Sequence, residues 1–437
     1  MKSVWLDTIN NSHNSKPPSF PALGKNIKTD VLIIGGGMAG ILCAYFLKKA
    51  GVDYILVEGN RIGSGITKNT TAKITSQHGL IYDKLIRTAG VEKAAMYLKA
   101  NQSAVGKFKE LAKEFPCGLE EKSAYVYSLK DTNAIEREVR AVNSLGFPAS
   151  FIEEIPLPFK TAGAVRFEKQ AQFNPLEFLY GIARDLNIYE NTFVKELAKN
   201  IAVTNKAKIK AERIIVATHF PFLNKHGSYF LKMYQHRSYV IALENTPDID
   251  GMYLEETQDG LSFRNYGNLL LIGGGDHRTG SLGGKWRVLR RFAKKYYPNS
   301  IEKYTWATQD CMTLDGVPYI GRYSDSVRGL YVTTGFNKWG MTGSMVGAMI
   351  LTDMVMGRKN PYAAVYSPGR SILKPQLLLN GVSAVGNLLT PTVPRCPHMG
   401  CALKWNKTEQ TWDCPCHGSR FKRDGKLINN PATGDLK

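Results

Sequence analysis

The 437-residue sequence predicts a mixed α/β (α+β) protein of two or three domains, with a nucleotide-binding unit at its start and a small domain of another kind at its end. The first prediction rests on a glycine-rich turn at 35–40, which stands between an apolar run and a stretch of helical periodicity. The second rests on the cysteines, because four of the seven crowd into 396–416. Such clustering in a protein without a visible secretory signal favours metal binding over disulfides.

The first element pattern is strand, turn, helix, strand. Residues 31–34 form the continuous apolar run of a buried parallel strand, and Gly35, Gly37 and Gly40 follow as G-x-G-x-x-G. A helix with apolar residues on one side then ends near 51, and the next strand ends at Glu58. The glycines let the backbone approach a pyrophosphate at a helix N-terminus, and the acid holds ribose hydroxyls. This arrangement predicts a dinucleotide site, and Glu58 favours a ribose without a phosphate.

The charge balance is strongly basic, with a formal net charge of +20. Such a surface attracts nucleic acid, anionic membrane or an acidic partner. The cations are spread along the chain, so we expect a basic enzyme that binds no nucleic acid. The densest stretch, 284–298, has the spacing of a surface helix. The apolar run 340–357 contains Asp353 and predicts a buried helix rather than a membrane span. We expect a cytoplasmic protein, either free or peripheral at the membrane.

Four further segments carry a family resemblance. The stretch "RIGSGITKNTTAKITSQHGL" at 61–80 resembles the segment after the first βαβ unit of the D-amino-acid-oxidase-like flavoproteins, the group of glycine oxidase, sarcosine oxidase and D-amino-acid dehydrogenase. Segments resembling three later parts of that family follow in the family's order, at 172–179, 211–221 and 315–355. The resemblance covers about 30–357 and implies FAD as the cofactor. The stretch at 269–280 lacks the third glycine of a second nucleotide motif, so electrons are expected from an organic substrate rather than from NAD(P)H.

The same resemblance implies a Rossmann-type FAD-binding domain interleaved with a substrate domain on an antiparallel sheet. The FAD-binding domain is expected at 1–80, 155–220 and 305–365, and the substrate domain at 81–154 and 221–304. Beyond the glycines and Glu58, the implied FAD-binding residues come from the stretch after the first unit and from the closing glycine-rich turn and helix. They are Thr70, Thr71, Gly335, Gly340, Met341 and Thr342.

The tail carries two boxes of soft metal ligands, "CPHMGC" and "CPCHGS". Cys396 and His398 form C-x-H, and Cys414 and His417 form C-x-x-H. Zinc accepts two cysteines and two histidines. The boxes themselves resemble the two loops of a Rieske [2Fe–2S] protein, in which two thiolates bind one iron and two imidazoles the other. The resemblance implies a small all-β Rieske domain at 380–437 after a linker at 366–379, leaning on the flavoprotein part because few residues precede the first box.

Other positions of the Rieske pattern carry over in part. Cys401 and Cys416 stand where respiratory Rieske proteins have a disulfide between the cluster loops, so the resemblance implies that bond. The stretch at 428–433 is placed like the proline loop that covers the cluster. Ser419 keeps one hydroxyl donor to a cluster sulfur, whereas Phe421 stands in the place of a second donor, a tyrosine.

The two resemblances together predict an FAD-dependent dehydrogenase that passes electrons one at a time through a Rieske cluster to an acceptor, either a protein or a quinone. Family analogy suggests the C–N bond of an amine or amino acid as the bond oxidised. The alternatives are an electron-transfer module reduced by a partner protein and an oxygen-using oxidase with a structural Rieske domain. Arg237 and Arg264 are candidates for holding a substrate carboxylate, and Cys311 for a covalent flavin bond. No catalytic residue is predicted.

Overall fold

The parallel sheet of the nucleotide-binding part is built around β1 (Ile27–Ile34). The computed structural model describes residues 2–11, 16–224, 226–257, 259–281, 286–391 and 394–436. The sheet has eight strands, and its main order is β16-β17-β10-β1-β2-β7, with β8 and β9 as a hairpin beside β10. Its other strands are β2 (Tyr54–Val57), β7 (Ile188–Tyr189), β8 (Val194–Ala198), β9 (Ile201–Thr204), β10 (Lys208–Val216), β16 (Tyr319–Arg322) and β17 (Leu330–Thr334).

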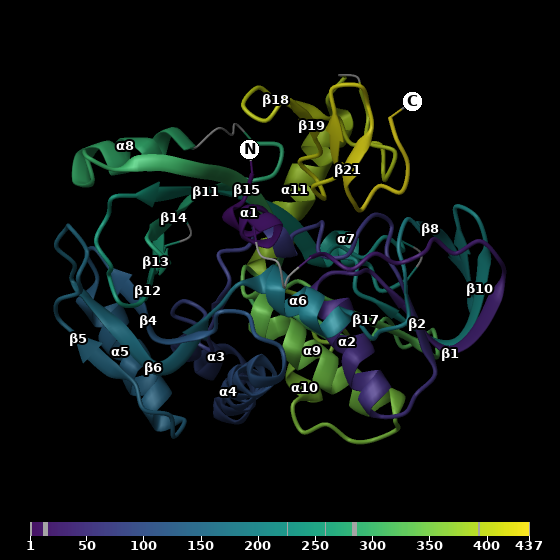
Figure 1. Cartoon of the computed structure of the whole chain (residues 1–437), viewed down its shortest axis with the longest axis horizontal. Helices are drawn as coiled ribbons and strands as arrows, with labels where there is room; N and C mark the ends of the chain where they lie inside the picture. The colour runs from purple at the N-terminus through teal and green to yellow at the C-terminus, as the bar shows by residue number, and fades with distance from the viewer. Residues whose placement is uncertain are drawn as a thin grey trace.

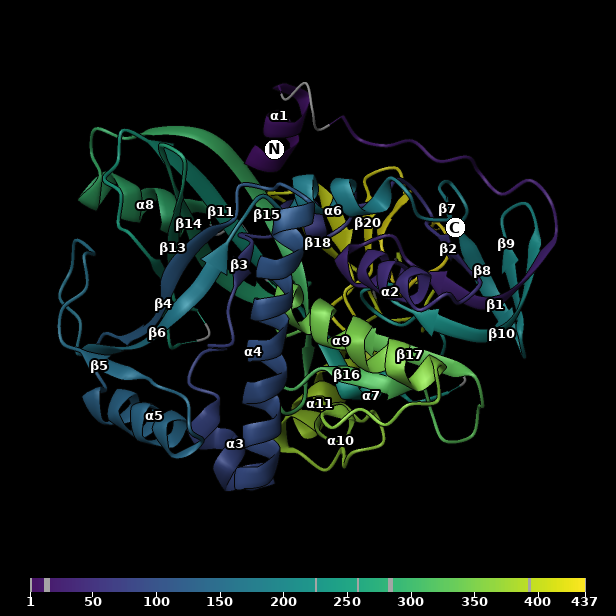
Figure 2. The same ribbon diagram turned by 60° about the horizontal axis from the view of Figure 1, so that its bottom comes forward.

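The centre of this sheet is parallel because its strands are joined by crossovers. β1 pairs in parallel with β2 and with β10, and β10 pairs in parallel with β17. The helices α2 (Met38–Lys49) and α9 (Gly340–Val355) pack side by side against it (Figure 2). Both helices are apolar nearly all round, as expected of helices buried between a sheet and other elements. The predicted strand–turn–helix–strand start and the buried helix at 340–355 are therefore confirmed.

A second sheet of nine strands makes up the other half of the flavoprotein part (Figure 1). Its order is β15-β11-β14-β13-β12-β4-β6-β3, with β5 beside β6, and all of its pairs are antiparallel except that of β12 with β4. The strands are β3 (Lys73–Ile74), β4 (Glu120–Ser128), β5 (Ser150–Ile152), β6 (Gly163–Gln172), β11 (Met233–Glu244), β12 (Met252–Glu255), β13 (Ser262–Tyr266), β14 (Leu269–Arg278) and β15 (Ile301–Thr313).

Most remaining helices cover the two sheets. They are α1 (Val4–Asn11), the short 3-10 helix η1 (Thr67–Asn69), α3 (Tyr82–Ala89), α4 (Val91–Glu114), α5 (Thr132–Ser144), α6 (Pro175–Ala183), α7 (Tyr229–Lys232), α8 (Trp286–Tyr296) and α10 (Ala363–Tyr366). The basic helix expected from the spacing of 284–298 is α8, which buries Trp286 and Leu289 on the second sheet. It is therefore a packed surface helix.

The C-terminal unit is a small antiparallel sheet that sits on top of the flavoprotein part (Figure 1). Its strands are β18 (Lys404–Asn406), β19 (Thr411–Asp413), β20 (Arg420–Lys422) and β21 (Leu427–Asn429). Helix α11 (Pro375–Leu389) precedes it and begins inside the segment expected to be a linker. The predicted fold class is confirmed, while the domain boundaries given above stay a prediction.

Candidate functional site

The glycine-rich turn between β1 and α2 has no room for side chains. Gly35 has φ +114°, and a Cβ there would lie 2.6 Å from the carbonyl oxygen of Ala217, the residue directly after the neighbouring strand β10. A Cβ on Gly40 would collide with the carbonyl oxygen of Gly35. The turn therefore packs directly against α2 and β10, which leaves the N-terminus of α2 open to an anionic group.

Glu58 follows the end of β2 and lies beside this turn. Its carboxylate accepts hydrogen bonds from the backbone N–H of Gly36 at 2.7 Å and of Asn60 at 2.9 Å. Burial raises the pKa of this carboxyl, and the two hydrogen bonds act against that effect. The acid is thus held at the rim of the turn, where a ribose would lie.

A cavity of about 1000 Å³ opens from the turn and runs between the two sheets to the C-terminal unit. Seven of the ten residues expected to bind the cofactor line it, namely Gly35, Gly37, Glu58, Thr70, Thr71, Gly340 and Met341. The other three lie behind its wall. Gly40 underlies the turn, Gly335 has φ +70° directly after β17, and the hydroxyl of Thr342 lies 3.0 Å from Nε2 of His78.

The shape of the cavity fits an extended dinucleotide. At one end the glycine turn forms a cradle that a Cβ would fill, and at the other α9 begins with Gly340 and Met341 in the wall. The N-terminus of a 16-residue helix at that point favours negative charge. The residues present therefore fit FAD.

Several titratable side chains in the cavity were not predicted from the sequence. Burial, together with the nearby charge of Arg264, lowers the pKa of Lys73 to about 7. Burial raises the pKa of Asp310 to about 6 and lowers that of His219 to about 4. Asp276 forms an ion pair with Lys338. These residues come from β3, β14, β15 and two loops, so nothing in their local sequence could have grouped them.

Both arginines considered for a substrate carboxylate have protein partners. Arg264 is buried and donates hydrogen bonds to the carbonyl oxygens of Thr71 and Ala72, each at 2.8 Å, so it supports the chain beside β3. Arg237 lines the cavity, but its guanidinium binds the carboxylate of Glu409, which comes from the C-terminal unit. The C-terminal unit therefore supplies the carboxylate that Arg237 binds.

Cys311, considered for a covalent flavin bond, is a buried thiol in the core beneath the parallel sheet. Burial raises its pKa well above the usual thiol value. It is not among the residues that line the cavity. A neutral thiol in that position acts as a core side chain.

The four predicted metal ligands meet at one end of the C-terminal sheet, on two loops of similar shape. The N–H of Gly400 donates to the carbonyl of Cys396 and that of Gly418 to the carbonyl of Cys414, each at 2.9 Å. The rings of His398 and His417 lie with centroids 4.9 Å apart. Both Nδ1 atoms are buried without a hydrogen-bond partner in the part of the chain that the structure describes.

Two orphaned imidazole nitrogens beside two buried thiols are the donor set of a [2Fe–2S] site with mixed ligands. The loops are joined by the Cys401–Cys416 disulfide, with Cα atoms 6.6 Å apart. The hydroxyl of Ser419 lies in hydrogen-bonding reach of Cys396 and accepts the N–H of Ala432 at 3.0 Å. Phe421 is fully buried in the same core of side chains. The site therefore fits the cluster.

The outer edges of the two histidines face the flavoprotein part. Nε2 of His398 donates to Oδ1 of Asn224 at 2.7 Å, and Nε2 of His417 donates to the carbonyl of Phe230 at 3.1 Å. The side chain of Gln235 in β11 donates to the carbonyl of His417 at 2.6 Å. The expectation that the C-terminal unit leans on the flavoprotein part is met, and the histidine edge forms the contact.

The same contact reaches the cavity wall. Asn430, in the stretch expected to cover the cluster, donates to the carbonyl oxygens of Thr218 and Phe220, each at 2.6 Å. Thr218 lines the cavity, and the ring of Phe220 lies 6.1 Å from that of His417. One short loop after β10 therefore separates the cavity from the histidine edge.

Comparison with protein families agrees with both halves of this description. Residues 30–354 match the model of the FAD dependent oxidoreductase family, and residues 382–437 match the Rieske [2Fe-2S] domain. The first range agrees with the extent of the predicted resemblance, 30–357. The glycine turn therefore lies in the region that matches the FAD-dependent family, and the two ligand boxes lie in the region that matches the Rieske domain.

Relatives exist for the whole chain and for its tail. The chain is 35% identical to YhfW of Bacillus subtilis (strain 168), whose name describes it as a Rieske 2Fe-2S iron-sulfur protein, over 96% of this chain and 95% of that protein. The tail is 47% identical over 45 residues to the cytochrome b6-f complex iron-sulfur subunit 1 of Synechocystis, 10% of this chain and 25% of that one.

Solved structures share the fold of the larger part. L-proline dehydrogenase from P. horikoshii superposes with a TM-score of 0.67 and 19% identity, covering 80% of this chain and 98% of that one. Glycine oxidase from Geobacillus kaustophilus superposes with a TM-score of 0.67 and 20% identity, covering 79% and 99%.

Proposed function

Because the chain belongs to the FAD-dependent oxidoreductase family and ends in a Rieske [2Fe–2S] domain, we propose that it is a dehydrogenase whose Rieske domain accepts electrons from the reduced flavin. The family makes it an enzyme that binds FAD, and the tail binds a [2Fe–2S] cluster. Bound FAD takes up two electrons with a hydride, whereas the cluster carries one electron at a time.

The observation that carries this proposal is the position of the histidine edge. His398 and His417 donate to Asn224 and Phe230, in and beside the loop that also forms the cavity wall. A structural domain would have no reason to turn its metal ligands toward the cavity.

We assign the ligands from the donor set described above. Cys396 and Cys414 bind one iron, and Nδ1 of His398 and of His417 bind the other, since both Nδ1 atoms are buried and without a partner among the described residues. Asn224 and the carbonyl of Phe230 then orient the rings through Nε2, as outer hydrogen-bond partners do for histidine ligands.

For FAD, we assign the turn at Gly35 and Gly37 and the N-terminus of α2 to the pyrophosphate, and Glu58 to the ribose. Gly40 keeps the turn close to α2, and Thr70 and Thr71 line the middle of the cavity. Gly335, Gly340, Met341 and Thr342 shape the start of α9, whose N-terminus favours negative charge on the ring system.

The substrate that we propose is an amine or amino acid oxidised at a C–N bond. The support is the shared fold with L-proline dehydrogenase and glycine oxidase, together with space for a small molecule between the sheets. A fold by itself does not determine the substrate. The final acceptor in this proposal takes one electron at a time, as a protein or a quinone does.

We place the protein in the cytoplasm, with support from three buried free thiols outside the tail, Cys43, Cys117 and Cys311. We also keep the domain division predicted from the sequence, with the Rieske domain at 380–437. Limited proteolysis with mass spectrometry of the fragments checks that division, since cleavage is expected first in exposed loops between the domains.

The test is an anaerobic screen of amines and amino acids for bleaching of the flavin, followed by steady-state turnover with a one-electron dye. A substrate should bleach the flavin and then reduce the cluster within the same chain. In Cys414→Ser, which cannot assemble the cluster, the substrate should still bleach the flavin while dye turnover falls at least tenfold. Unchanged dye turnover in that variant would show that the flavin passes electrons out directly.

The screen also separates the two alternatives. Rapid turnover with oxygen that survives Cys414→Ser would favour an oxidase with a structural Rieske domain. If no small molecule bleached the flavin but a partner protein reduced it, the result would favour an electron-transfer module. NADH and NADPH should leave the flavin oxidised, because the stretch at 269–280 forms strand β14 and no second nucleotide turn.

A further inference from the structure

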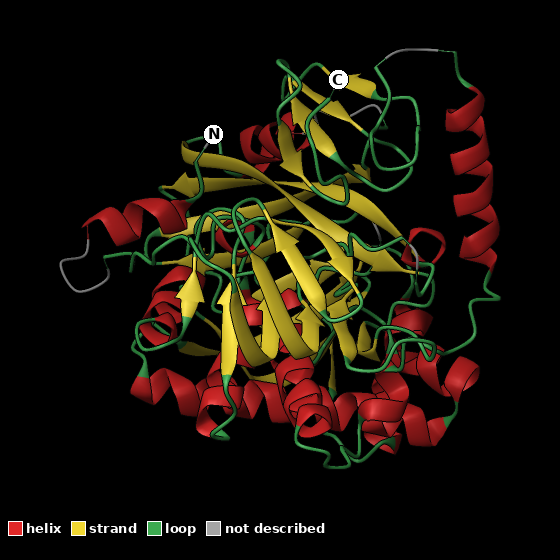
Figure 3. Cartoon of the chain, turned by 90° about the vertical axis from the view of Figure 1, so that its right-hand side faces the viewer, coloured by secondary structure: helices red, strands yellow, loops and turns green. Residues whose placement is uncertain are grey.

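Helix α11 exposes its apolar side chains and turns its polar ones toward the protein, which is the reverse of an ordinary surface helix. Its apolar side chains point away from the protein and are between 56% and 77% exposed; they are Leu378, Leu379, Val382, Val385 and Leu389. Their spacing places them on one face of the helix. In Figure 3 the helix runs along the right-hand edge of the molecule, outside the sheets.

The polar side of α11 faces the protein instead. Asn380 is buried, and its Oδ1 accepts a hydrogen bond from Arg278 of β14 at 3.0 Å. One turn earlier, Gln376 donates to the same oxygen at 3.2 Å. The backbone carbonyl of Asn387 accepts the N–H of Ala402 in the Rieske domain at 3.0 Å. These contacts determine which side of the helix faces outward.

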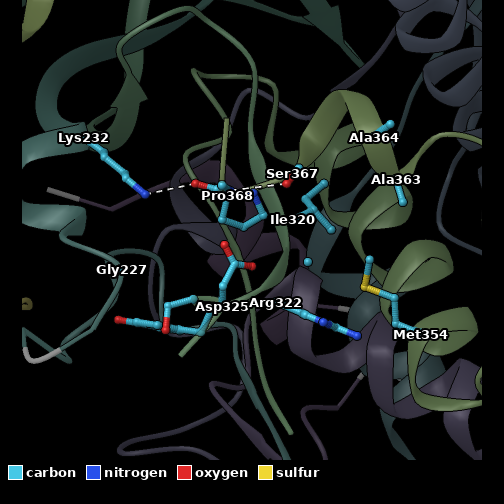
Figure 4. Close-up of a pocket in the computed structure, with 14 residues that line it drawn as sticks. Gly227, Lys232, Ile320, Arg322, Asp325, Met354, Ala363, Ala364, Ser367 and Pro368 are labelled. Atoms are coloured by element: carbon cyan, nitrogen blue, oxygen red, sulfur yellow. Dashed lines mark hydrogen bonds between the residues drawn. The ribbon is translucent and has the colours of Figure 1, made fainter. Parts of the chain in front are cut away.

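The chain before α11 is fastened to the flavoprotein part. Arg370 forms an ion pair with Asp315 and donates to the carbonyl of Pro318 at 3.0 Å. Lys232 donates to the carbonyl of Pro368 at 2.9 Å, at a pocket of about 360 Å³ (Figure 4). The apolar face is therefore held at a set place on the surface, and a contiguous apolar patch rimmed by polar residues marks an interaction site.

The chemistry of the face selects the kind of partner. Its exposed side chains are leucine and valine only, so they offer no hydrogen-bonding atom. Protein interfaces are enriched in aromatic residues and arginine and carry about one hydrogen bond per 100–200 Å². A second copy of the chain would bring its own net charge of +20 against this one. Hydrocarbon is the better match.

The charges around α11 select the kind of lipid. Residues 354–408 contain seven lysines and arginines and no aspartate or glutamate, and two of these cations, Arg358 and Arg370, are ion-paired with Asp353 and Asp315 outside the stretch. Lys374 stands at the N-terminal end of the helix, and Arg395 donates hydrogen bonds to the carbonyls of Leu388 and Thr390 at its C-terminal end. Cations beside an apolar helix face are attracted by anionic headgroups.

We propose that the outer face of α11 inserts into the surface of an anionic lipid bilayer, with the helix in the plane of the membrane. Among the described residues, no helix is long and apolar enough to cross a bilayer. The 15 residues of α11 are suited to lying at the interface. The two cluster loops, which follow the helix along the chain, are then held near the membrane. This proposal stands independently of the substrate.

The test is sedimentation of the full-length protein, loaded with FAD and cluster, with vesicles of 30% phosphatidylglycerol in phosphatidylcholine and with vesicles of pure phosphatidylcholine. The wild type should bind the anionic vesicles, bind the neutral ones at least tenfold more weakly, and lose part of its binding at 0.5 M salt. The triple variant Leu378→Ser/Val382→Ser/Val385→Ser should lower the anionic partition coefficient at least tenfold. Its flavin and cluster absorbance should match the wild type.

The matched control is Val288→Ser/Ile301→Ser, which removes two exposed apolar side chains of α8 and β15. It should bind vesicles like the wild type. A wild type that stays in the supernatant with both kinds of vesicle, or a triple variant that binds as well as the control, overturns the proposal. So does light scattering that shows a dimer which the triple variant abolishes, because the face would then belong to a second copy.

Discussion

Adding a single methyl group at Gly40 should abolish most of the flavin binding. A Cβ at this position collides with the carbonyl oxygen of Gly35, so Gly40→Ala has to push α2 away from the glycine turn. We expect the purified variant to retain less than a tenth of its flavin, measured as the ratio of flavin to protein absorbance. Gly106→Ala, in α4 with no described residue within 4 Å of the Cβ it would gain, should retain full flavin. Equal flavin content in the two variants would contradict this reading of the turn.

At the cluster, Ser419 and Phe421 should set the reduction potential. Rieske potentials span about −150 to +300 mV, and hydrogen bonds to the sulfurs raise them. Ser419 lies within reach of Cys396, while Phe421 is buried in the same core without a hydroxyl. We expect a potential below the top of that range. Phe421→Tyr should raise it and Ser419→Ala should lower it, each by about 40 mV if one net hydrogen bond is worth about 1 kcal/mol.

The measurement is a redox titration followed by EPR of the reduced cluster. Trp412→Phe, on the strand that pairs with Phe421, serves as a packing control and should leave the midpoint in place. If Phe421→Tyr left the midpoint unmoved while Ser419→Ala shifted it, residue 421 would not present its hydroxyl to the cluster.

At the scale of elements, α3 begins against a buried carboxylate of α5. Glu138 accepts the N–H of Tyr82 at 2.8 Å and of Asp83 at 2.9 Å, and burial raises its pKa to about 7 despite these hydrogen bonds. Its folded pKa lies above the unfolded value of about 4.3. The protonated carboxyl of Glu138 therefore makes its full contribution to folding stability below its unfolded pKa, and this contribution is lost as the pH rises through about 7.

Glu138→Gln should remove this dependence on pH. The free energy of unfolding of the variant, minus that of the wild type, should rise by about 3 kcal/mol between pH 4 and pH 8, since one pKa unit corresponds to about 1.4 kcal/mol. Urea unfolding followed by helical circular dichroism measures it. Glu136→Gln, on the exposed side of the same helix, should show no such change. A difference that is the same at both pH values would mean that the pKa of Glu138 is the same in the folded and unfolded states.

Elements with a local signal could be predicted from the sequence, whereas elements defined by distant contacts could not. The strand, glycine turn and helix around Gly35 follow from apolar periodicity, and the two ligand boxes follow from their spacing. Helix α11 lies partly in the segment expected to be a linker. It was not predicted as a surface helix because its outward side is apolar, whereas the usual pattern has a polar outward side. Its Pro375 at the first helical position was the available signal.

The site was predictable where one motif contains it and not where the fold assembles it. Lys73, Asp276 and Asp310 meet in one cavity only because the second sheet brings β3, β14 and β15 around it. Likewise, Asn224 and Phe230 carry no mark in the sequence of a role beside the histidine edge. Their positions depend on the docking of two domains, which no periodicity records.

At the scale of the whole molecule, the Arg237–Glu409 pair fastens the Rieske domain. Both side chains are about 5% exposed, and Glu409 also binds Arg420. Glu409→Gln leaves Arg237 without the carboxylate that accepts its two hydrogen bonds. Loss of one partner from a buried pair costs about 3 kcal/mol, which corresponds to roughly a hundredfold in the docking equilibrium.

We therefore expect Glu409→Gln to speed proteolytic release of the tail and to slow reduction of the cluster, measured by stopped flow after the flavin is reduced. Both cofactors should remain bound, since neither Arg237 nor Glu409 is among the assigned ligands. Glu154→Gln, at an exposed position, should behave as the wild type does. Unaltered cluster reduction in Glu409→Gln would show that this pair does not hold the two parts together.

The docking of the histidine edge on the same chain also determines the kinetic order of cluster reduction. Two separate electron carriers must meet, so their rate rises with concentration and falls with ionic strength when charges steer the encounter. Here Asn224 and Phe230 of the same chain already occupy the edge. The encounter is replaced by a fixed effective concentration. Cluster reduction should then be first order, with the same rate constant in dilute and concentrated enzyme and in low and high salt.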